Sequence, residues 1–283
     1  MKVSVNHNLR LAFDIRRGQW LISDVDALLP TALEFLSHTP LSVEATDFTP
    51  ISTVMSDSLN GEFASNNSRV VVIPIHGTLT KYDTCAGPGI ETIASEMLRF
   101  AADKDVVGFV LDIDSGGGAC NAIPPMVAAI KKIQAMGKPV VAHCDFCASA
   151  AYWIASQCDS IFADNFLSEF GSIGVMTQIV DSRNLASGEK VITIYAEESK
   201  DKNLAYRRAL DGDYKLMQDK MSPIVVAFQT AVKDGRKALC ADAPGVLSGD
   251  TFRCEDAINL GLVDAMLSLD EAIDNVFIRS SFK

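Results

Sequence analysis

From Arg69 onward the chain alternates short apolar runs with stretches of helical period, and this alternation limits the fold more than any other feature. The apolar runs are "VVVIPIHG", "VVGFVLDID", "PVVAHCD" and "SIFA", and the helical stretches are "GIETIASEMLRFAADKD" and "IPPMVAAIKKIQAMGK". Continuous apolar runs are typical of strands that are covered on both faces. Strands that alternate with helices form βαβ units, so we expect an α/β fold with a largely parallel sheet. Sites in such sheets form at the carboxyl ends of the strands.

Residues 1–68 differ from residues 69–283 in composition and in hydrophobic pattern. We expect them to form an N-terminal helical arm and an irregular connector ahead of one domain. The stretch "DVDALLPTALEFLS" has a helical period, and the connector after it is rich in Ser, Thr, Asn and Pro. The N-terminus lacks the uninterrupted apolar region of a signal peptide, and no run approaches the roughly 18 apolar residues of a membrane span. We therefore expect a cytoplasmic protein without a membrane span.

The net charge of -11 argues against a nucleic-acid binder, which would need a basic face. Seven cysteines, an odd number, fit reduced thiols better than a disulfide framework. Cys144 and Cys147 form a C-x-x-C pair, but Cys158, Cys240 and Cys254 do not supply the second close pair that a zinc site would need. We interpret the pair as buried structural thiols and expect neither a metal nor another cofactor.

Ser149 lies where a strand should end and a helix should begin, in the stretch "HCDFCASAAYWIAS". A serine in this position is often only a helix cap. However, its neighbours Ala148, Ala150 and Ala151 are small and leave room for a substrate backbone, and the Ala150 amide would point toward a developing oxyanion. α/β-Hydrolases place their nucleophilic serine on the same kind of strand–serine–helix turn. Ser149 is therefore a candidate nucleophile as well as a candidate cap.

A run of three glycines, Gly116 to Gly118, follows an earlier predicted strand in "DIDSGGGA". Glycines let backbone amides face a ligand without obstruction by side chains, although a plain turn is equally compatible with this run. The run precedes Ser149 by one βα unit, so both lie at the same rim of the sheet. It could supply a second oxyanion donor beside the Ala150 amide.

The general base is harder to identify. None of the four histidines follows Ser149, where a hydrolase-type triad would place one. His76 ends a strand, and His143 lies inside a buried strand pattern, where a hydrogen-bonded core histidine is expected. A lysine in a dry pocket can act instead, because desolvation favours the neutral amine. Lys200 and Lys202 follow the strand-like run "KVITIYA" and are candidates, with a solvated charged loop as the alternative interpretation.

Five motifs, in order along the chain, resemble the signal-peptide-peptidase-A (SppA) family of serine peptidases, including its phage head-maturation members. They are "VVVIPIHGTL", "DKDVVGFVLDIDSGGG", "GKPVVAHCDFCASAAYWIAS", "FGSIGV" and "LSGDTFRCEDAINLGLVD". The resemblance implies that residues 69–283 form a peptidase domain with a Clp-protease/crotonase-like fold of repeated ββα and βαβ units. It also implies catalysis by a Ser/Lys dyad.

Carried over by position, the resemblance makes Ser149 the nucleophile and Lys200 the general base, with Lys202 as the alternative base. Gly117 and Gly118 then line the oxyanion hole together with Ala150. Ser172, in "GSIG", would help to position the lysine. Two departures from the family pattern are visible: Gly116 replaces a proline, and "EESKDKN" lacks the usual glycine before the lysine.

The cellular members of this family are membrane-anchored, whereas "GQWLISDVDALLP" is similar to the N-terminal segment of phage members. We therefore expect a homo-oligomeric peptidase that cuts phage scaffold or capsid proteins during head maturation. Two alternatives remain open. One is a crotonase-type acyl-thioester enzyme, which would not need Ser149, and the other is a non-catalytic assembly protein of the same fold.

Overall fold

The structure is a computed structural model that describes residues 20–22, 52–55, 67–84, 87–179 and 193–282, the first two stretches as backbone only. One large sheet has the strand order β10–β7–β6–β4–β3–β2, and β8 and β9 extend it beside β6. The strands are β2 (Ser52–Met55), β3 (Arg69–His76), β4 (Val106–Ser115), β6 (Val140–Ala148), β7 (Ser160–Ala163), β8 (Glu169–Gly171), β9 (Thr251–Arg253) and β10 (Ala265–Met266). A second, two-stranded sheet pairs β1 (Trp20–Ile22) with β5 (Gly117–Ala119).

The predicted α/β class and the largely parallel sheet are confirmed. The central strands β3, β4, β6 and β7 run parallel to one another, β8 runs parallel to β6, and β10 runs parallel to β7. Two strands pair antiparallel with their neighbours: β2 with β3, and β9 with β8. The four apolar runs that were predicted as strands are β3, β4, β6 and β7, and the two predicted helical stretches contain α3 (Ile90–Ala101) and α4 (Ile123–Ala135).

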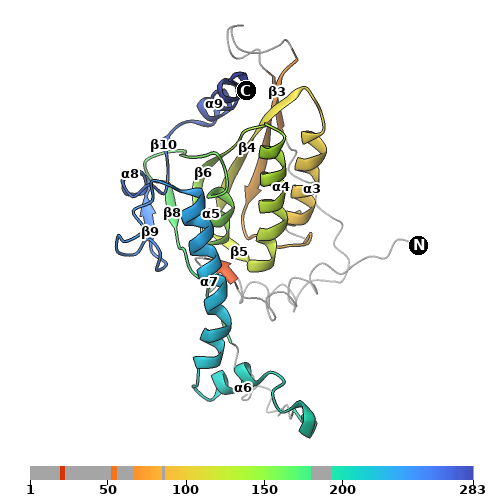
Figure 1. Ribbon diagram of the computed structural model, residues 1–283, viewed down its shortest axis with the longest axis vertical. Coiled ribbons are helices and arrows are strands. Elements are labelled where there is room, and N and C mark those ends of the chain that lie inside the picture. The colour runs from red at the N-terminus through yellow and green to blue at the C-terminus, as the bar shows by residue number, and fades with distance from the viewer. Residues whose placement is uncertain (1–19, 23–51, 56–66, 85–86, 180–192, 283) are drawn as a thin grey trace, which may run out of the picture.

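Helices cover both faces of the sheet (Figure 1). Helices α3, α4 and α5 (Ala150–Ala155) pack on one face, where Ile90, Met97 and Ile130 are buried in the larger core, as their periodicity predicts. Phe100 and Val127 are only partly buried at the margin of this core. Helix α9 (Leu269–Ser281) covers the other face and begins with a capping box between Ser268 and Glu271.

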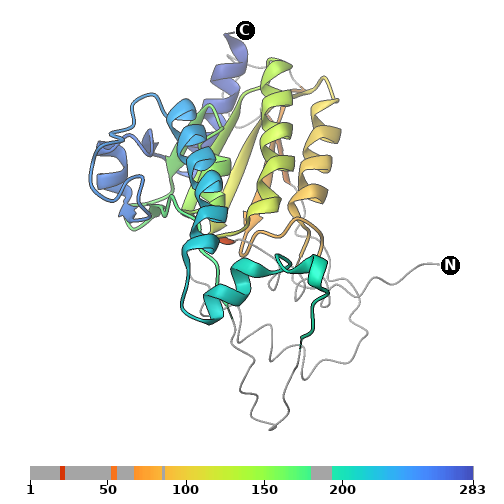
Figure 2. The ribbon, with the colours of Figure 1, turned by 60° about the horizontal axis from the view of Figure 1, so that its bottom comes forward.

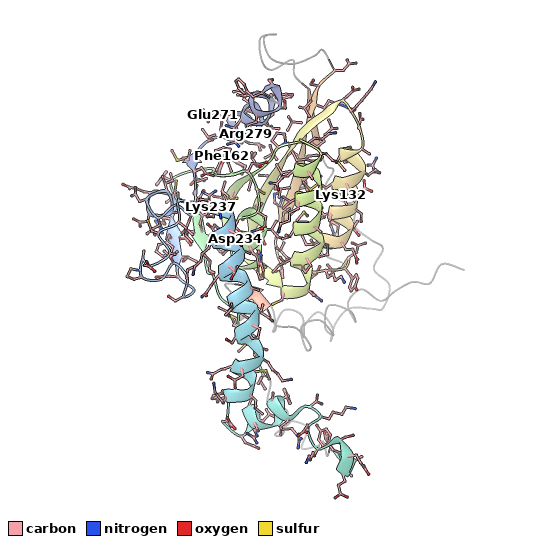
Figure 3. The ribbon with its side chains drawn as sticks, viewed as in Figure 1. Lys132, Phe162, Asp234, Lys237, Glu271 and Arg279 are labelled. Carbon is pink, nitrogen blue, oxygen red and sulfur yellow. The ribbon has the colours of Figure 1, made fainter. Side chains whose placement is uncertain are left out.

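Apolar packing and a hydrogen bond join α9 to the sheet, and Figure 3 labels Phe162 and Arg279, which take part in them. Phe162 of β7 belongs to the smaller core cluster, which includes Ile273 and Val276 of α9. Arg279 of α9 donates a hydrogen bond to the Ser160 hydroxyl of β7, at 2.7 Å. This packing fixes the strand that follows the Ser149 helix.

The long helix α7 (Lys215–Gly235) joins the sheet body to a protrusion. Its carboxyl half packs on α5, where Phe228 stacks on Trp153 with ring centroids 4.7 Å apart. Its amino half extends away from the body, and α6 (Leu204–Leu210) lies at its far end (Figures 1 and 2). Helix α8 (Cys254–Asn259) lies beside β8 and β9.

The structure corrects one predicted element and leaves two others outside its range. Residues 193–196 of the strand-like run "KVITIYA" form no strand, and Ile194 among them is 88% exposed. An apolar, β-branched sequence becomes a strand only when it meets a partner strand and a core, and this one meets neither in the described part of the chain. The predicted arm helix and residues 190–192 lie outside the described residues. The predicted boundary near residue 68 stays a prediction, although β1 and β2 come from the segment before it.

Candidate active site

Ser149 lies at the turn between β6 and α5 in a backbone conformation that L-residues rarely adopt. Its φ is 55° and its ψ is -120°, and the residue is only 2% exposed. The Ser149 amide donates to the Gly171 carbonyl of β8 at 2.8 Å, which ties the turn to the neighbouring strand. Among the described residues, its hydroxyl caps no amide of α5. The hydroxyl therefore does not act as a helix cap, and a strained turn is the arrangement that presents a nucleophile at a sheet rim.

The glycine run folds into a short strand rather than a plain turn. Gly117 has a φ of 102° and begins β5, whose next residue forms a bridge with Leu79. The Leu79 amide donates to the Gly117 carbonyl at 2.9 Å, and the Ala119 amide donates to the Leu79 carbonyl at 2.8 Å. Gly118 must be a glycine here, because a Cβ atom would lie 2.1 Å from the Leu79 carbonyl oxygen.

Ser115 is a site residue that sequence reasoning missed. Its hydroxyl is buried, donates to the Gly77 carbonyl at 2.5 Å and accepts from the Gly117 amide at 3.1 Å. Ser115 thus joins the turn after β3 to the start of β5. The Gly117 amide, one of the three predicted oxyanion donors, is used within the protein in this structure. The only sequence signal was a serine directly before the glycines, and this position alone does not reveal the bond.

The other two predicted donors have different positions. Ala150 is the first residue of α5, and first-turn amides have no acceptor within their own helix. Gly118 has its amide on the side of β5 that faces away from Leu79, because neighbouring residues of a strand direct their polar groups to alternate sides. Both amides belong to the elements that flank Ser149, namely α5 and β5.

Ser172 lies close to Ser149 through the backbone. It follows Gly171, whose carbonyl accepts the Ser149 amide, and its own amide donates to the Asp250 carbonyl at 2.7 Å. Ser172 also has a positive φ of 52°. Two serines in rare backbone conformations therefore lie at the ends of adjacent strands, β6 and β8, at the same rim of the sheet.

Lys200 and Lys202 are not brought to this rim within one chain. Lys200 directly follows the short helix η3 (Glu197–Ser199), and both lysines are exposed. The Lys200 carbonyl accepts a hydrogen bond from Arg207, whose guanidinium lies 4.6 Å from the Tyr195 ring centroid. Their segment lies at the far end of the protrusion in both ribbon views (Figures 1 and 2). Within the described part of the chain, no hydrogen bond or ion pair joins either lysine to Ser149, and the dry pocket expected around Lys200 is not present.

His76 and His143, the histidines within the described ranges, are engaged elsewhere. Asp112 of β4 lies between His76, at 3.2 Å, and His143, at 3.4 Å. Burial by itself would raise the pKa of Asp112, but the hydrogen bonds and charges of the two imidazoles outweigh it and lower that pKa. His143 is buried and also lies 3.3 Å from Asp164. It is therefore the hydrogen-bonded core histidine that the sequence predicts.

The cysteines of the C-x-x-C pair are buried in the larger core, as predicted. Burial raises the pKa of Cys144, with a further contribution from neighbouring Cys147, so its thiol stays protonated at neutral pH. Burial also raises the pKa of Cys120 to about 12. Protonated, buried thiols are poor nucleophiles and poor metal ligands. In the portion of the chain that the structure covers, no group of three or more His, Cys, Asp or Glu residues is arranged to hold a metal.

Comparisons with known proteins agree with the SppA resemblance. The family model described as peptidase family S49 matches residues 132–280, which include Ser149, Ser172 and Lys200. Protease 4 of Haemophilus influenzae is 27% identical over 73% of this chain, and Protease 4 of Salmonella typhi is 29% identical over 74%. The head-tail preconnector protein GP5 of Enterobacteria phage P21 is 29% identical over 72% of this chain.

The chain spans about a third of the length of the two Protease 4 relatives (34%) and 42% of the phage protein. None of the helices in the described ranges is both long enough and apolar enough to cross a membrane. Because the family model covers more than half of the chain, the chain belongs to peptidase family S49.

Proposed function

We propose that this chain is a serine endopeptidase in which Ser149 is the nucleophile. The observation that carries the proposal is the conformation of Ser149: a strained, buried turn residue whose hydroxyl does not cap the helix that follows it. Strain of this kind is stored where a side chain must be aimed for function. Membership of a peptidase family agrees with this role.

In the proposed reaction, the Ser149 hydroxyl oxygen attacks the carbonyl carbon of the scissile peptide bond. A neutral lysine amine takes the hydroxyl proton and then delivers it to the leaving amine, so that an acyl-enzyme remains. Water, deprotonated by the same lysine, hydrolyses the acyl-enzyme and regenerates the serine. The amides of Gly118 and Ala150 stabilise the negative charge on the tetrahedral oxygen in both steps. The Gly117 amide is bonded to the Ser115 hydroxyl and does not reach the substrate. In this proposal Gly117 instead supplies the turn that positions the Gly118 amide.

The base in this proposal is Lys200, delivered by a second copy of the chain. Lys200 is exposed, and the segment that carries it, between η3 and α6, lies on the protrusion, away from β5 and α5 of the same chain (Figure 1). The protrusion also carries large apolar side chains that are exposed to solvent: Ile194, Tyr206 and Tyr214. Exposed apolar side chains on a projecting element favour packing against another protein surface. A homo-oligomer would bury them and would bring a lysine into a drier environment, where the neutral amine is favoured.

Subunit complementation tests both the dyad and its assembly. Ser149→Ala and Lys200→Met are purified separately, and each is expected to be inactive while remaining folded. When the two variants are mixed and allowed to exchange subunits, activity should return, because a mixed oligomer contains sites with an intact serine and an intact lysine. Lys202→Met is the matched control and should retain most of its activity.

The outcomes separate the alternatives. If mixing restores nothing although the subunits exchange, the serine and the lysine of one site come from the same chain. If Lys202→Met is the inactive variant, the base is Lys202. If both methionine variants cleave peptides, the dyad is wrong. A serine-directed phosphonate that modifies Ser149 would separate a peptidase from a crotonase-type enzyme or a non-catalytic assembly protein.

The biological role that we propose is the processing of phage scaffold or capsid proteins in a host cytoplasm or an assembling head. It is supported by the similarity to a phage protein named as a head-tail preconnector and by the N-terminal "GQWLISDVDALLP" segment. Incubation of the protein with the scaffold and capsid proteins encoded beside it, followed by mass spectrometry, would test the role. Cleavage that is absent in Ser149→Ala supports it, and intact proteins would contradict it.

A further inference from the structure

The N-terminal segment contributes a strand to the candidate active site. Strand β1 pairs antiparallel with β5, in a register that places Trp20 opposite Ala119, Leu21 opposite Gly118, and Ile22 opposite Gly117. Strand β1 also contacts α5, the helix that begins directly after Ser149. Figure 1 shows β1 beside β5 at the end of the sheet body. Residues about 130 positions apart in sequence therefore meet at the rim that carries Ser149.

The backbone of β5 determines which groups β1 can bind. The Gly117 carbonyl and the Ala119 amide are both bonded to Leu79, on the inner side of β5. The amide and the carbonyl of Gly118, between them, face the outer side, where β1 lies. Opposite residues of an antiparallel pair alternate between pairs that exchange both hydrogen bonds and pairs that exchange none. Because the polar groups of Gly118 face β1, Gly118 belongs to an exchanging pair, and the residue opposite it is Leu21.

We propose that residues 20–22 occupy the edge at which the main chain of an extended peptide substrate binds, so that the N-terminal segment is an intramolecular inhibitor. This inference rests on the function proposed above. The Gly118 amide has one hydrogen, and it cannot donate to the Leu21 carbonyl and to the oxyanion of a substrate at the same time. Strand addition is a common mode of peptide recognition, and a glycine-rich edge accepts a chain of almost any sequence.

The inhibition is reversible in this arrangement, because the contact is short. Three residues pair along β5, which provides few main-chain hydrogen bonds, each of modest net strength. The segment competes well mainly because it belongs to the same chain and is therefore present at a high effective concentration. A substrate that binds more surface than these three positions would displace it.

Two proline variants of the full chain test the inference. Leu21→Pro removes the amide that donates to the Gly118 carbonyl. Ile22→Pro is the matched control, since the Ile22 amide points away from β5 and proline is tolerated at such edge positions. In protein that retains Ser149, Leu21→Pro should raise kcat/KM for a reporter peptide about fivefold or more, the effect of losing roughly one net hydrogen bond. Ile22→Pro should stay within about twofold of the unmodified chain on the same reasoning.

A binding measurement makes the test independent of catalysis. The probe is a fluorescent peptide with the sequence of residues 17–25, RGQWLISDV, and the protein carries Ser149→Ala in addition to either proline substitution. The Leu21→Pro protein should bind the peptide at least about fivefold more tightly than the Ile22→Pro protein, because only its β5 edge is vacated.

Each result is decisive. Equal peptide affinity of the two proline variants, or no binding by Leu21→Pro, overturns the proposed occupancy. Tighter binding with unchanged turnover shows that the segment occupies the edge without inhibiting the enzyme, and this also overturns the proposal. If tighter binding is seen but no variant with Ser149 cleaves any peptide, the proposed function fails while the peptide site stands.

Discussion

The conformation of Ser149 leads to a stability prediction that runs against the usual effect of glycine. Replacing Ser149 by Ala removes the proposed nucleophile but keeps a Cβ atom at a residue with φ 55° and ψ -120°. Replacing it by Gly removes the Cβ atom as well, and glycine adopts such conformations without steric strain. We therefore expect Ser149→Gly to be more stable than Ser149→Ala, although both are catalytically inactive.

The magnitude follows from two opposing terms. A non-glycine residue held in a rare backbone region costs about 1–3 kcal/mol. Glycine loses more backbone freedom on folding, which costs about 0.5–1 kcal/mol relative to alanine. The hydroxyl cancels from the comparison, because both variants lack it. The net gain of Ser149→Gly over Ser149→Ala should be about 1 kcal/mol, or an increase in Tm of roughly 2–4 °C for a domain of this size.

Urea and thermal unfolding of the two variants, followed by circular dichroism, measures this difference. The matched control is Ala128→Gly, at an exposed position of helix α4, where the same change from Ala to Gly should cost about 1 kcal/mol. The reasoning depends on the opposite signs of the two effects. If Ser149→Gly is less stable than Ser149→Ala by the amount seen at residue 128, no strain is stored at the nucleophile.

Two further predictions concern the framework of the site. Asp264→Asn should lower the free energy of unfolding by about 2–3 kcal/mol at pH 7, because it leaves the buried Arg236 guanidinium without its charged partner. The Asp264 side chain is 38% exposed, and this keeps the loss below that of a fully buried pair. Burial alone would raise the pKa of Asp264, but hydrogen bonds from Arg236 and the Ile161 amide outweigh it and lower that pKa. The stabilisation by the Asp264 carboxylate is therefore present above the unfolded pKa of about 3.9, and it is lost as the pH falls through the lower pKa of the folded protein. The stability difference between the two proteins in urea titrations should therefore shrink below about pH 4, and a constant difference down to pH 2 would contradict this assignment. Gly118→Ala should lose peptidase activity and about 1–3 kcal/mol of stability, because its Cβ atom would lie 2.1 Å from the Leu79 carbonyl, whereas Gly174→Ala, whose Cβ atom would meet only Gly249 at 3.8 Å, should unfold like the unmodified protein.

Local patterns were sufficient to predict the sheet and the position of Ser149 at the turn between a strand and a helix. The runs around Val110 and Val141 are apolar at consecutive positions, and only a strand covered on both faces uses such a sequence in a short element. Ser149 could be placed at the rim because a strand signal and a helix signal meet at one residue that is flanked by alanines. These signals lie within a few positions of one another, where the sequence determines the structure most directly.

Features that depend on distant partners could not be predicted. The bond between Ser115 and Gly117 uses the ordinary residue types of a turn, and its importance depends on Gly77, which lies 38 positions from Ser115. The run before Lys200 has the β-branched composition of a strand, but residues 193–196 find no partner strand. The pairing of β1 with β5 joins a three-residue segment to a glycine edge, and three residues carry no periodicity that a sequence analysis could detect.

The candidate site has a rigid half and a separable half, and this division bears on how the proposed enzyme would be controlled. Ser149, Gly118 and Ala150 are fixed by β5, β6 and α5, which are anchored in the core, so the proposed nucleophile and the proposed oxyanion donors are organised before a substrate arrives. Lys200 and β1 come from segments outside that core. In the proposed mechanism Lys200 must arrive from a neighbouring subunit, and β1 must leave the edge of β5. An isolated chain then holds a nucleophile without a base and a donor amide that is already bonded. Cleavage would begin only where assembly supplies the lysine and a longer substrate displaces the strand, which suits a peptidase that acts inside an assembling structure.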